Sequence, residues 1–140
     1  MGAVIHARDV RKRYGRSTLA LDGLDFDVAA GRIVGLMGSN GAGKTTALKS
    51  ILGLTPFDGE LQVLGRDPRT ERDSLMKDVC FIADVSVLPK WLRVDHALDY
   101  VAGVHPKFDR KRADDVLART DIKRKSKVGE LSKGMITQLH

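Results

Sequence analysis

The chain has 140 residues, of which 42% are hydrophobic and 30% charged, and its formal net charge is +6. This length and composition are typical of a folded, water-soluble domain with one hydrophobic core, and they exclude a disordered, fibrous or membrane-spanning chain. The positive charge would suit nucleic acid, an anionic membrane surface or phosphate ligands, but the basic clusters are dispersed along the chain, so charge alone selects no partner.

The first part of the chain predicts strands. Residues 4–15 show a mixed strand pattern with a basic end, and residues 21–31 place Leu24, Phe26 and Val28 on one face. We expect these two segments to pair as an antiparallel hairpin.

A buried strand, a glycine-rich stretch and a helix are predicted next. Residues 33–37 are almost continuously apolar, as in a strand covered on both faces. Residues 38–46, GSNGAGKTT, follow directly. Beyond them, apolar side chains at helical spacing predict a helix that ends near Gly53.

The remaining pattern changes from mixed α/β to helical. It predicts a turn at residues 58–59, a strand at 60–64, a turn at 65–68, a short helix at 70–78 and a buried strand at 80–83. Cys80 lies in that last strand, where we expect a small buried side chain in a reducing, cytosolic protein. Two helices are predicted within residues 94–105 and 109–120, the second capped by Asp109.

The glycine-rich stretch matches the phosphate-loop pattern G-x-x-x-x-G-K-[ST] in full, with the required strand before it and helix after it. Glycines allow main-chain amides to surround a phosphate, and the helix adds its positive N-terminal end. Lys44 is suited to reach the β- and γ-phosphates, and the Thr45 hydroxyl to ligate Mg²⁺. The alternative, a plain glycine-rich turn, is disfavoured by the complete motif.

A second motif narrows the family. The stretch VGELSKGM, residues 128–135, together with GSNGAGKTT and the aromatic residue in RKRYG, resembles the ATP-binding subunit of an ABC transporter, and LSKGM is most similar to ABC-2-type exporters. The resemblance implies an α/β fold, a P-loop NTPase of the ABC ATPase type, truncated after the signature motif. Residues 1–83 would form an incomplete ATP-binding core with an antiparallel β part, and residues 84–140 a helical subdomain ending at the signature.

The resemblance also assigns roles to individual residues. Tyr14 would stack on adenine, although a tyrosine packed on the sheet is the alternative. The Ser132 side chain and the Gly134 amide would face a nucleotide held by a second subunit in a head-to-tail dimer. The nucleotide-binding residues implied in this way are Tyr14, Gly38, Ser39, Asn40, Gly41, Ala42, Gly43, Lys44, Thr45, Thr46, Ser132 and Gly134.

Some positions depart from the family pattern. Lys133 and Met135 stand where Gly and Gln are usual, and Asp84 stands where Gln is usual. Asp84 could approach Mg²⁺, but a surface acid at a strand end is an equal alternative. Trp91 lies where such proteins meet their membrane partner, with burial inside the helical subdomain as the alternative.

The function implied is binding of ATP and Mg²⁺ by a cytoplasmic subunit at the inner face of the membrane, which couples ATP binding and hydrolysis to export through a transmembrane permease. In the family, the residues that activate water follow the signature, so we assign no catalytic residue and expect residues 1–140 to bind ATP without hydrolysing it and to leave the strand at 33–37 exposed. The alternatives are a soluble ABC-type ATPase acting on nucleic acid or ribosomes, and a short, non-hydrolysing regulatory module. The soluble ATPase would need a long coiled-coil insertion or tandem domains, and neither is visible in the sequence, so we expect no nucleic acid partner. Tyr14 and LSKGM disfavour GTPases and small-molecule kinases.

Overall fold

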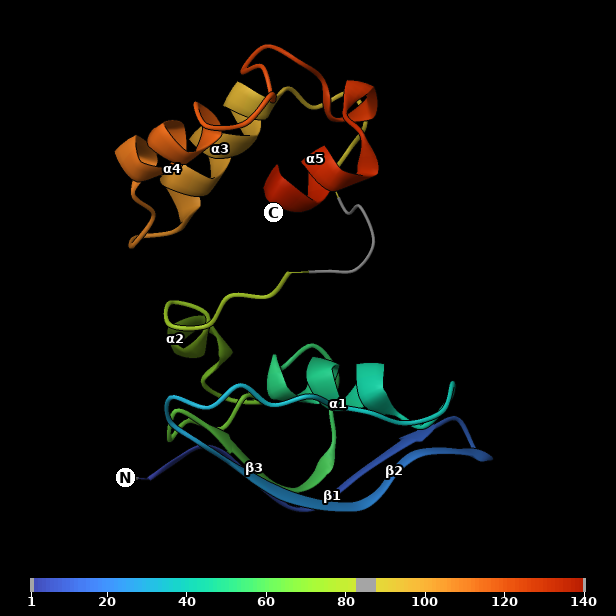
Figure 1. Cartoon of the computed structure of the whole chain (residues 1–140). Coiled ribbons are helices and arrows are strands. Elements are labelled where there is room, and N and C mark those ends of the chain that lie inside the picture. The colour runs from blue at the N-terminus through green and yellow to red at the C-terminus, as the bar shows by residue number, and fades with distance from the viewer. Residues whose placement is uncertain (1, 83–87, 140) are drawn as a thin grey trace. The chain divides into compact units, whose positions relative to one another are not determined.

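The computed structural model describes residues 2–82 and 88–139. By its internal contacts the chain divides into two compact units, Met1–Val79 and Cys80–His140. The first unit is a small sheet with helices, and the second is helical (Figure 1).

The sheet of the first unit is antiparallel and has the strand order β2-β1-β3. Its strands are β1 (Ala3–Tyr14), β2 (Thr18–Ala29) and β3 (Asp58–Val63). In the register, Ala7 of β1 lies opposite Phe26 on one side and Leu61 on the other. The predicted hairpin between the first two strands is confirmed.

Helix α1 (Lys44–Ile51) lies over one face of this sheet (Figure 1), and α2 (Arg72–Leu75) follows β3. Alternate strand residues point toward α1, because successive side chains of a strand face opposite ways. The core between them consists of Ala7, Val10, Leu21, Ala47, Phe57, Leu61, Val63 and Leu75. Most of these side chains are aliphatic, so the removal of apolar surface from water holds α1 to the sheet.

Strand β3 begins at Asp58, so the predicted turn at residues 58–59 is wrong. The turn-like sequence instead marks a bulge, since the pairing between β1 and β3 shifts register between Arg8 and Arg11. Gly59 has φ +90°, and a Cβ there would lie 2.2 Å from the main-chain oxygen of Asp9. Only glycine permits this close approach of two backbones.

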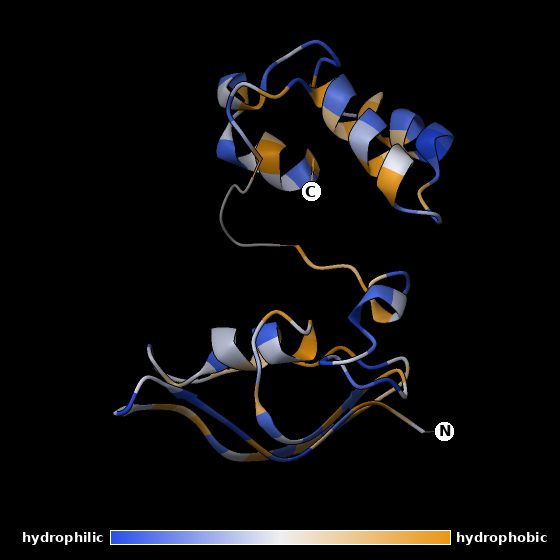
Figure 2. Ribbon diagram, turned by 180° about the vertical axis from the view of Figure 1, so that it is seen from behind, coloured by the Kyte–Doolittle hydropathy of each residue, from blue (hydrophilic) through white to orange (hydrophobic). Residues whose placement is uncertain are grey.

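Two predicted strands are not formed. Residues 32–39 have no regular secondary structure and pair with no described strand. Ile33 and Met37 are 104% and 92% exposed, and exposure of residues 33–37 was expected. The helices, in contrast, carry both hydrophobic and hydrophilic residues (Figure 2). Residues 80–82 also form no strand, and Cys80 is exposed rather than buried. A strand is stable only when neighbours satisfy its amides and carbonyls, and the described chain offers none beside these segments.

The second unit contains α3 (Val94–Val104), α4 (Arg110–Leu117), a 3₁₀ turn (Val128–Glu130) and α5 (Lys133–Leu139). The two predicted helices are therefore confirmed. Asp109 caps α4 as expected, since its side chain accepts a hydrogen bond from the Arg112 amide at 2.9 Å. The core of this unit is formed by Val94, Leu117 and Ile122.

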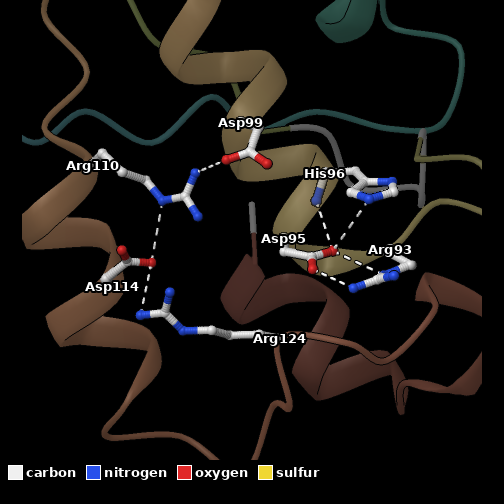
Figure 3. A network of polar contacts seen from close by, with 7 residues as sticks. All are labelled: Arg93, Asp95, His96, Asp99, Arg110, Asp114 and Arg124. Atoms are coloured by element: carbon white, nitrogen blue, oxygen red, sulfur yellow. Dashed lines mark hydrogen bonds and ion pairs between the residues drawn. The ribbon is translucent and has the colours of Figure 1, made fainter.

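A network of ion pairs lies on the polar side of α3 and α4 (Figure 3). The Arg110 guanidinium contacts Asp99 of α3 and, at 3.2 Å, Asp114 of its own helix. Asp114 also accepts from Arg124 at 3.1 Å, so the turn before the 3₁₀ segment is tied to the same network. The hydrogen bond to Asp99, followed by that to Asp114, raises the pKa of Arg110 above its usual value. None of the described helices is long and apolar enough to cross a membrane.

Candidate phosphate-binding site

The glycine-rich loop joins the unpaired segment 32–39 to the first turn of α1 (Figure 1). Gly43 is the N-cap of the helix with φ +84°, and Gly41 has φ +86°. A Cβ at residue 43 would lie 2.2 Å from the main-chain oxygen of Ala20 in β2. The glycine therefore allows the helix start to sit directly against the sheet.

Lys44 folds back over this loop. Its Nζ donates hydrogen bonds to the carbonyl oxygens of Gly38 and Ser39, both at 2.8 Å. An ammonium has three donors, so a further hydrogen bond remains available to it. The loop thus has a cation held at its entrance, while the Thr45 side chain at the helix start is exposed.

Tyr14, from the end of β1, lines the same cavity as the loop. The cavity has a volume of about 420 Å³, and the residues around it are Tyr14, Thr18, Leu19, Ala20, Asn40, Gly41, Ala42, Gly43, Lys44, Thr45 and Thr46. Side-chain hydrogen bonds with Thr55 and, second in size, with Thr46 lower the pKa of the Tyr14 hydroxyl. Tyr14 is 44% exposed, so part of the residue is accessible to a ligand.

This arrangement fits a polyphosphate. The N-terminus of α1, an eight-residue helix, carries amides without intrahelical partners and the positive end of the helix dipole. Gly41 and Gly43 have no Cβ, which permits their positive φ angles and leaves the loop backbone open where a phosphate would approach. Lys44 adds a full positive charge, and Tyr14 adds an aromatic face on the same cavity.

For Mg²⁺, the described residues contain no cluster of three His, Cys, Asp or Glu side chains. A magnesium ion accepts one or two protein oxygens together with phosphate oxygens and waters, so the Thr45 hydroxyl fits as a single ligand. Asp84, the second predicted ligand, lies outside the described residues.

Ser132 and Gly134 belong to the second unit, at the start of α5. The Ser132 Oγ accepts a hydrogen bond from the Met135 amide at 3.2 Å, as a helix cap does. Both residues are exposed. Trp91 is also exposed, at 73%, which excludes the alternative of burial in this unit.

Two groups near Tyr14 were missed by the sequence analysis. Thr55, which bonds the Tyr14 hydroxyl, follows α1 in a loop, and no sequence signal points to it. Lys12 has its Nζ 5.1 Å from the centre of the Tyr14 ring. Its spacing was a usable signal, because residues two apart on a strand share a face.

Comparison with known proteins agrees with this geometry. A family model described as ABC transporter matches residues 21–140. Nod factor export ATP-binding protein I from Burkholderia lata is 35% identical over 150 residues, which covers 98% of this chain and 47% of that protein. Phosphonates import ATP-binding protein PhnC 1 from Pseudomonas syringae pv. syringae is 36% identical over 132 residues, which covers 81% of this chain and 49% of that protein.

A solved structure shows the same fold. It is an ATP-binding cassette determined as a dimer in a post-hydrolysis state with ADP and Pi bound, and it matches 96% of this chain and 66% of its own with a TM-score of 0.80 and 22% identity. The chain spans about half the length of the two curated relatives. The predicted fold class, that of a P-loop ATPase with an N-terminal antiparallel sheet, is therefore confirmed.

Proposed function

Because the chain belongs to the ABC transporter family, we propose that residues 38–46 and Tyr14 bind ATP, and that the protein is the nucleotide-binding subunit of an exporter. The observation that carries the proposal is the single cavity shared by the glycine-rich loop, Lys44 and the Tyr14 ring. The loop amides and Lys44 hold the phosphates, and Tyr14 stacks on the base. Thr45 supplies a hydroxyl to Mg²⁺, which would offset phosphate charge.

Export rather than import is supported by the stretch LSKGM and by the Nod factor export relative, which aligns over nearly the whole chain. A relative named for phosphonate import aligns over 81% of the chain, so the direction of transport rests on the first comparison. In the proposed assembly the subunit lies at the cytoplasmic face of the membrane on a permease. Trp91 is an exposed aromatic side chain suited to that contact.

A head-to-tail dimer would complete the site. Ser132 and Gly134 are exposed at the start of α5, where a hydroxyl and a free main-chain amide can face an anion. We propose that they contact the nucleotide bound by a second subunit. The similar cassette with ADP and Pi is itself a dimer.

Calorimetric titration with ATP tests the site. Lys44→Ala removes the cation at the loop, and because charge-assisted hydrogen bonds contribute about 1.5–3 kcal/mol each, we expect ATP affinity to fall at least about a hundredfold. Lys49→Ala, at the exposed end of the same helix, is the matched control and should change affinity by less than about threefold. Equal affinity of Lys44→Ala and the unchanged chain would contradict the proposal.

The same protein tests hydrolysis. Residues 1–140 hold binding groups for ATP, but the resemblance assigns none of them to water activation, so we expect no phosphate release above background. Steady release by the purified chain, lost in Lys44→Ala, would show that a residue of this stretch activates water.

A further inference from the structure

Lys12 and Tyr14 form a cation–π pair beside the candidate nucleotide site. The two residues are separated by one position in β1, so their side chains leave the same face of the strand. The Lys12 Nζ lies 5.1 Å from the centre of the Tyr14 ring, within the range at which an ammonium is attracted to an aromatic face.

The hydroxyl end of Tyr14 lies near two threonines. Side-chain hydrogen bonding with Thr55 and, second in size, with Thr46 lowers the pKa of this hydroxyl. Thr46 belongs to α1 and lines the cavity, whereas Thr55 lies in the loop that leads toward β3.

The two faces of the ring have different surroundings. Tyr14 lines the cavity together with the glycine-rich loop, whereas Lys12 is not among the described residues that line it. Of the two members of the pair, only the tyrosine borders the space that the loop also borders. An aromatic ring has two equivalent negative faces, so a cation on one leaves the second open for stacking.

We propose that Lys12 is a positioning residue for base recognition, which holds one face of the Tyr14 ring so that a nucleoside base stacks on the face toward the cavity. This deepens the proposed ATP binding and depends on it. The ammonium draws electron density of the ring toward itself, which favours an electron-rich base on the opposite side. The affinity of a ligand that has phosphates but no base should not depend on this pair.

Paired titrations with ATP and with inorganic tripolyphosphate test the proposal. Lys12→Met keeps the length of the side chain and removes its charge. We expect ATP to bind about two- to fivefold more weakly, as befits an exposed cation–π pair, and tripolyphosphate to bind as before. Lys12→Arg should restore ATP binding, because a guanidinium also stacks on aromatic rings.

Two further variants separate stacking from general charge. In a Tyr14→Leu background, Lys12→Met should have no additional effect on ATP, since the ring through which it acts is gone. Lys49→Met is the matched control. The charge of Lys49 also lowers the pKa of Tyr14, but the described cation–π pair of Tyr14 is with Lys12 and not with Lys49. It should affect ATP and tripolyphosphate alike.

Three results would overturn the role of Lys12: unchanged ATP affinity in Lys12→Met, equal weakening of both ligands, or an effect that persists without Tyr14. Each of them leaves ATP binding by the unchanged chain intact, so the proposed function survives. Failure of the unchanged chain to bind ATP would overturn the proposed function and this role together. Circular dichroism of each variant confirms that its fold is retained.

Discussion

Ala20 and Gly43 lie in direct contact, so that a Cβ on residue 43 would be 2.2 Å from the Ala20 carbonyl oxygen. We predict that Gly43→Ala separates the start of α1 from β2 and adds the strain of φ +84°. The thermal midpoint in scanning calorimetry should fall by an amount equivalent to more than about 2 kcal/mol, and ATP affinity should fall with it.

Gly41→Ala is the control for that experiment. Gly41 has φ +86°, nearly the same backbone conformation, but nothing lies within 4 Å of a Cβ placed on it. We expect only the conformational strain of about 1–2 kcal/mol. Equal destabilisation by the two substitutions would mean that the contact with Ala20 contributes nothing.

Arg110 joins α3 to α4 through Asp99 and Asp114. Solvent screens these pairs, and we predict that Arg110→Ala lowers the urea midpoint of the second unit by a small but measurable amount. The sole tryptophan, Trp91, lies in this unit, so its fluorescence in a urea titration reports the change. Lys111→Ala, at an exposed position of α4, is the control and should change the free energy of unfolding by no more than about 0.5 kcal/mol.

Asp27 should make the first unit sensitive to acid. A hydrogen bond from Arg8, at 2.5 Å, and a smaller effect of His6 lower the pKa of Asp27. Since the folded-state pKa is depressed, its contribution to stability is present above the unfolded value of about 3.9 and is lost as the pH falls through the folded value. We predict that Asp27→Asn narrows the difference in thermal midpoint between pH 7 and pH 3. Asp22→Asn, the same change on the same strand, is the control.

The unpaired segment 32–39 should promote association of the chain. Ile33 and Met37 are fully exposed, so replacing both with Ser removes apolar surface that no described neighbour covers. We predict that the free energy of unfolding changes by less than about 0.5 kcal/mol. Light scattering should begin to rise only at a higher protein concentration than for the unchanged chain. Leu61→Ala in the core should instead lower the free energy of unfolding by about 2–5 kcal/mol and should not raise the protein concentration at which scattering begins.

Local signals predicted the elements that need few partners. The alternation of Leu24 and Phe26, the helical spacing after the glycines and the cap at Asp109 each lie within one element or its nearest neighbour, and the structure shows all three. The phosphate-loop motif was likewise recognisable, because every residue in it is contiguous. The roles of its residues remain predictions.

The wrong predictions concern elements whose structure depends on residues far away in the sequence. The apolar runs at 33–37 and 80–82 have strand-forming composition, yet a strand requires partners that a local pattern does not supply. Gly59 is compatible with a turn as well as with a bulge, because both favour glycine at positive φ. Thr55 comes near Tyr14 only through folding, which no motif records. Lys12, two residues from Tyr14 in the same strand, could have been found by its spacing.

The main-chain hydrogen bonds differ between the helix side of the glycine-rich loop and the segment that precedes the loop. On the helix side, the amide of Ala47 bonds to the Gly43 carbonyl at 2.8 Å, and Gly43 rests on β2. On the other side, residues 32–37 have no main-chain hydrogen bond to the described chain. Amide hydrogens should therefore exchange with solvent quickly in residues 32–37 and slowly within α1. The change from fast to slow exchange should fall within the glycine-rich loop. A bound phosphate would meet its most rigid donors at the helix start.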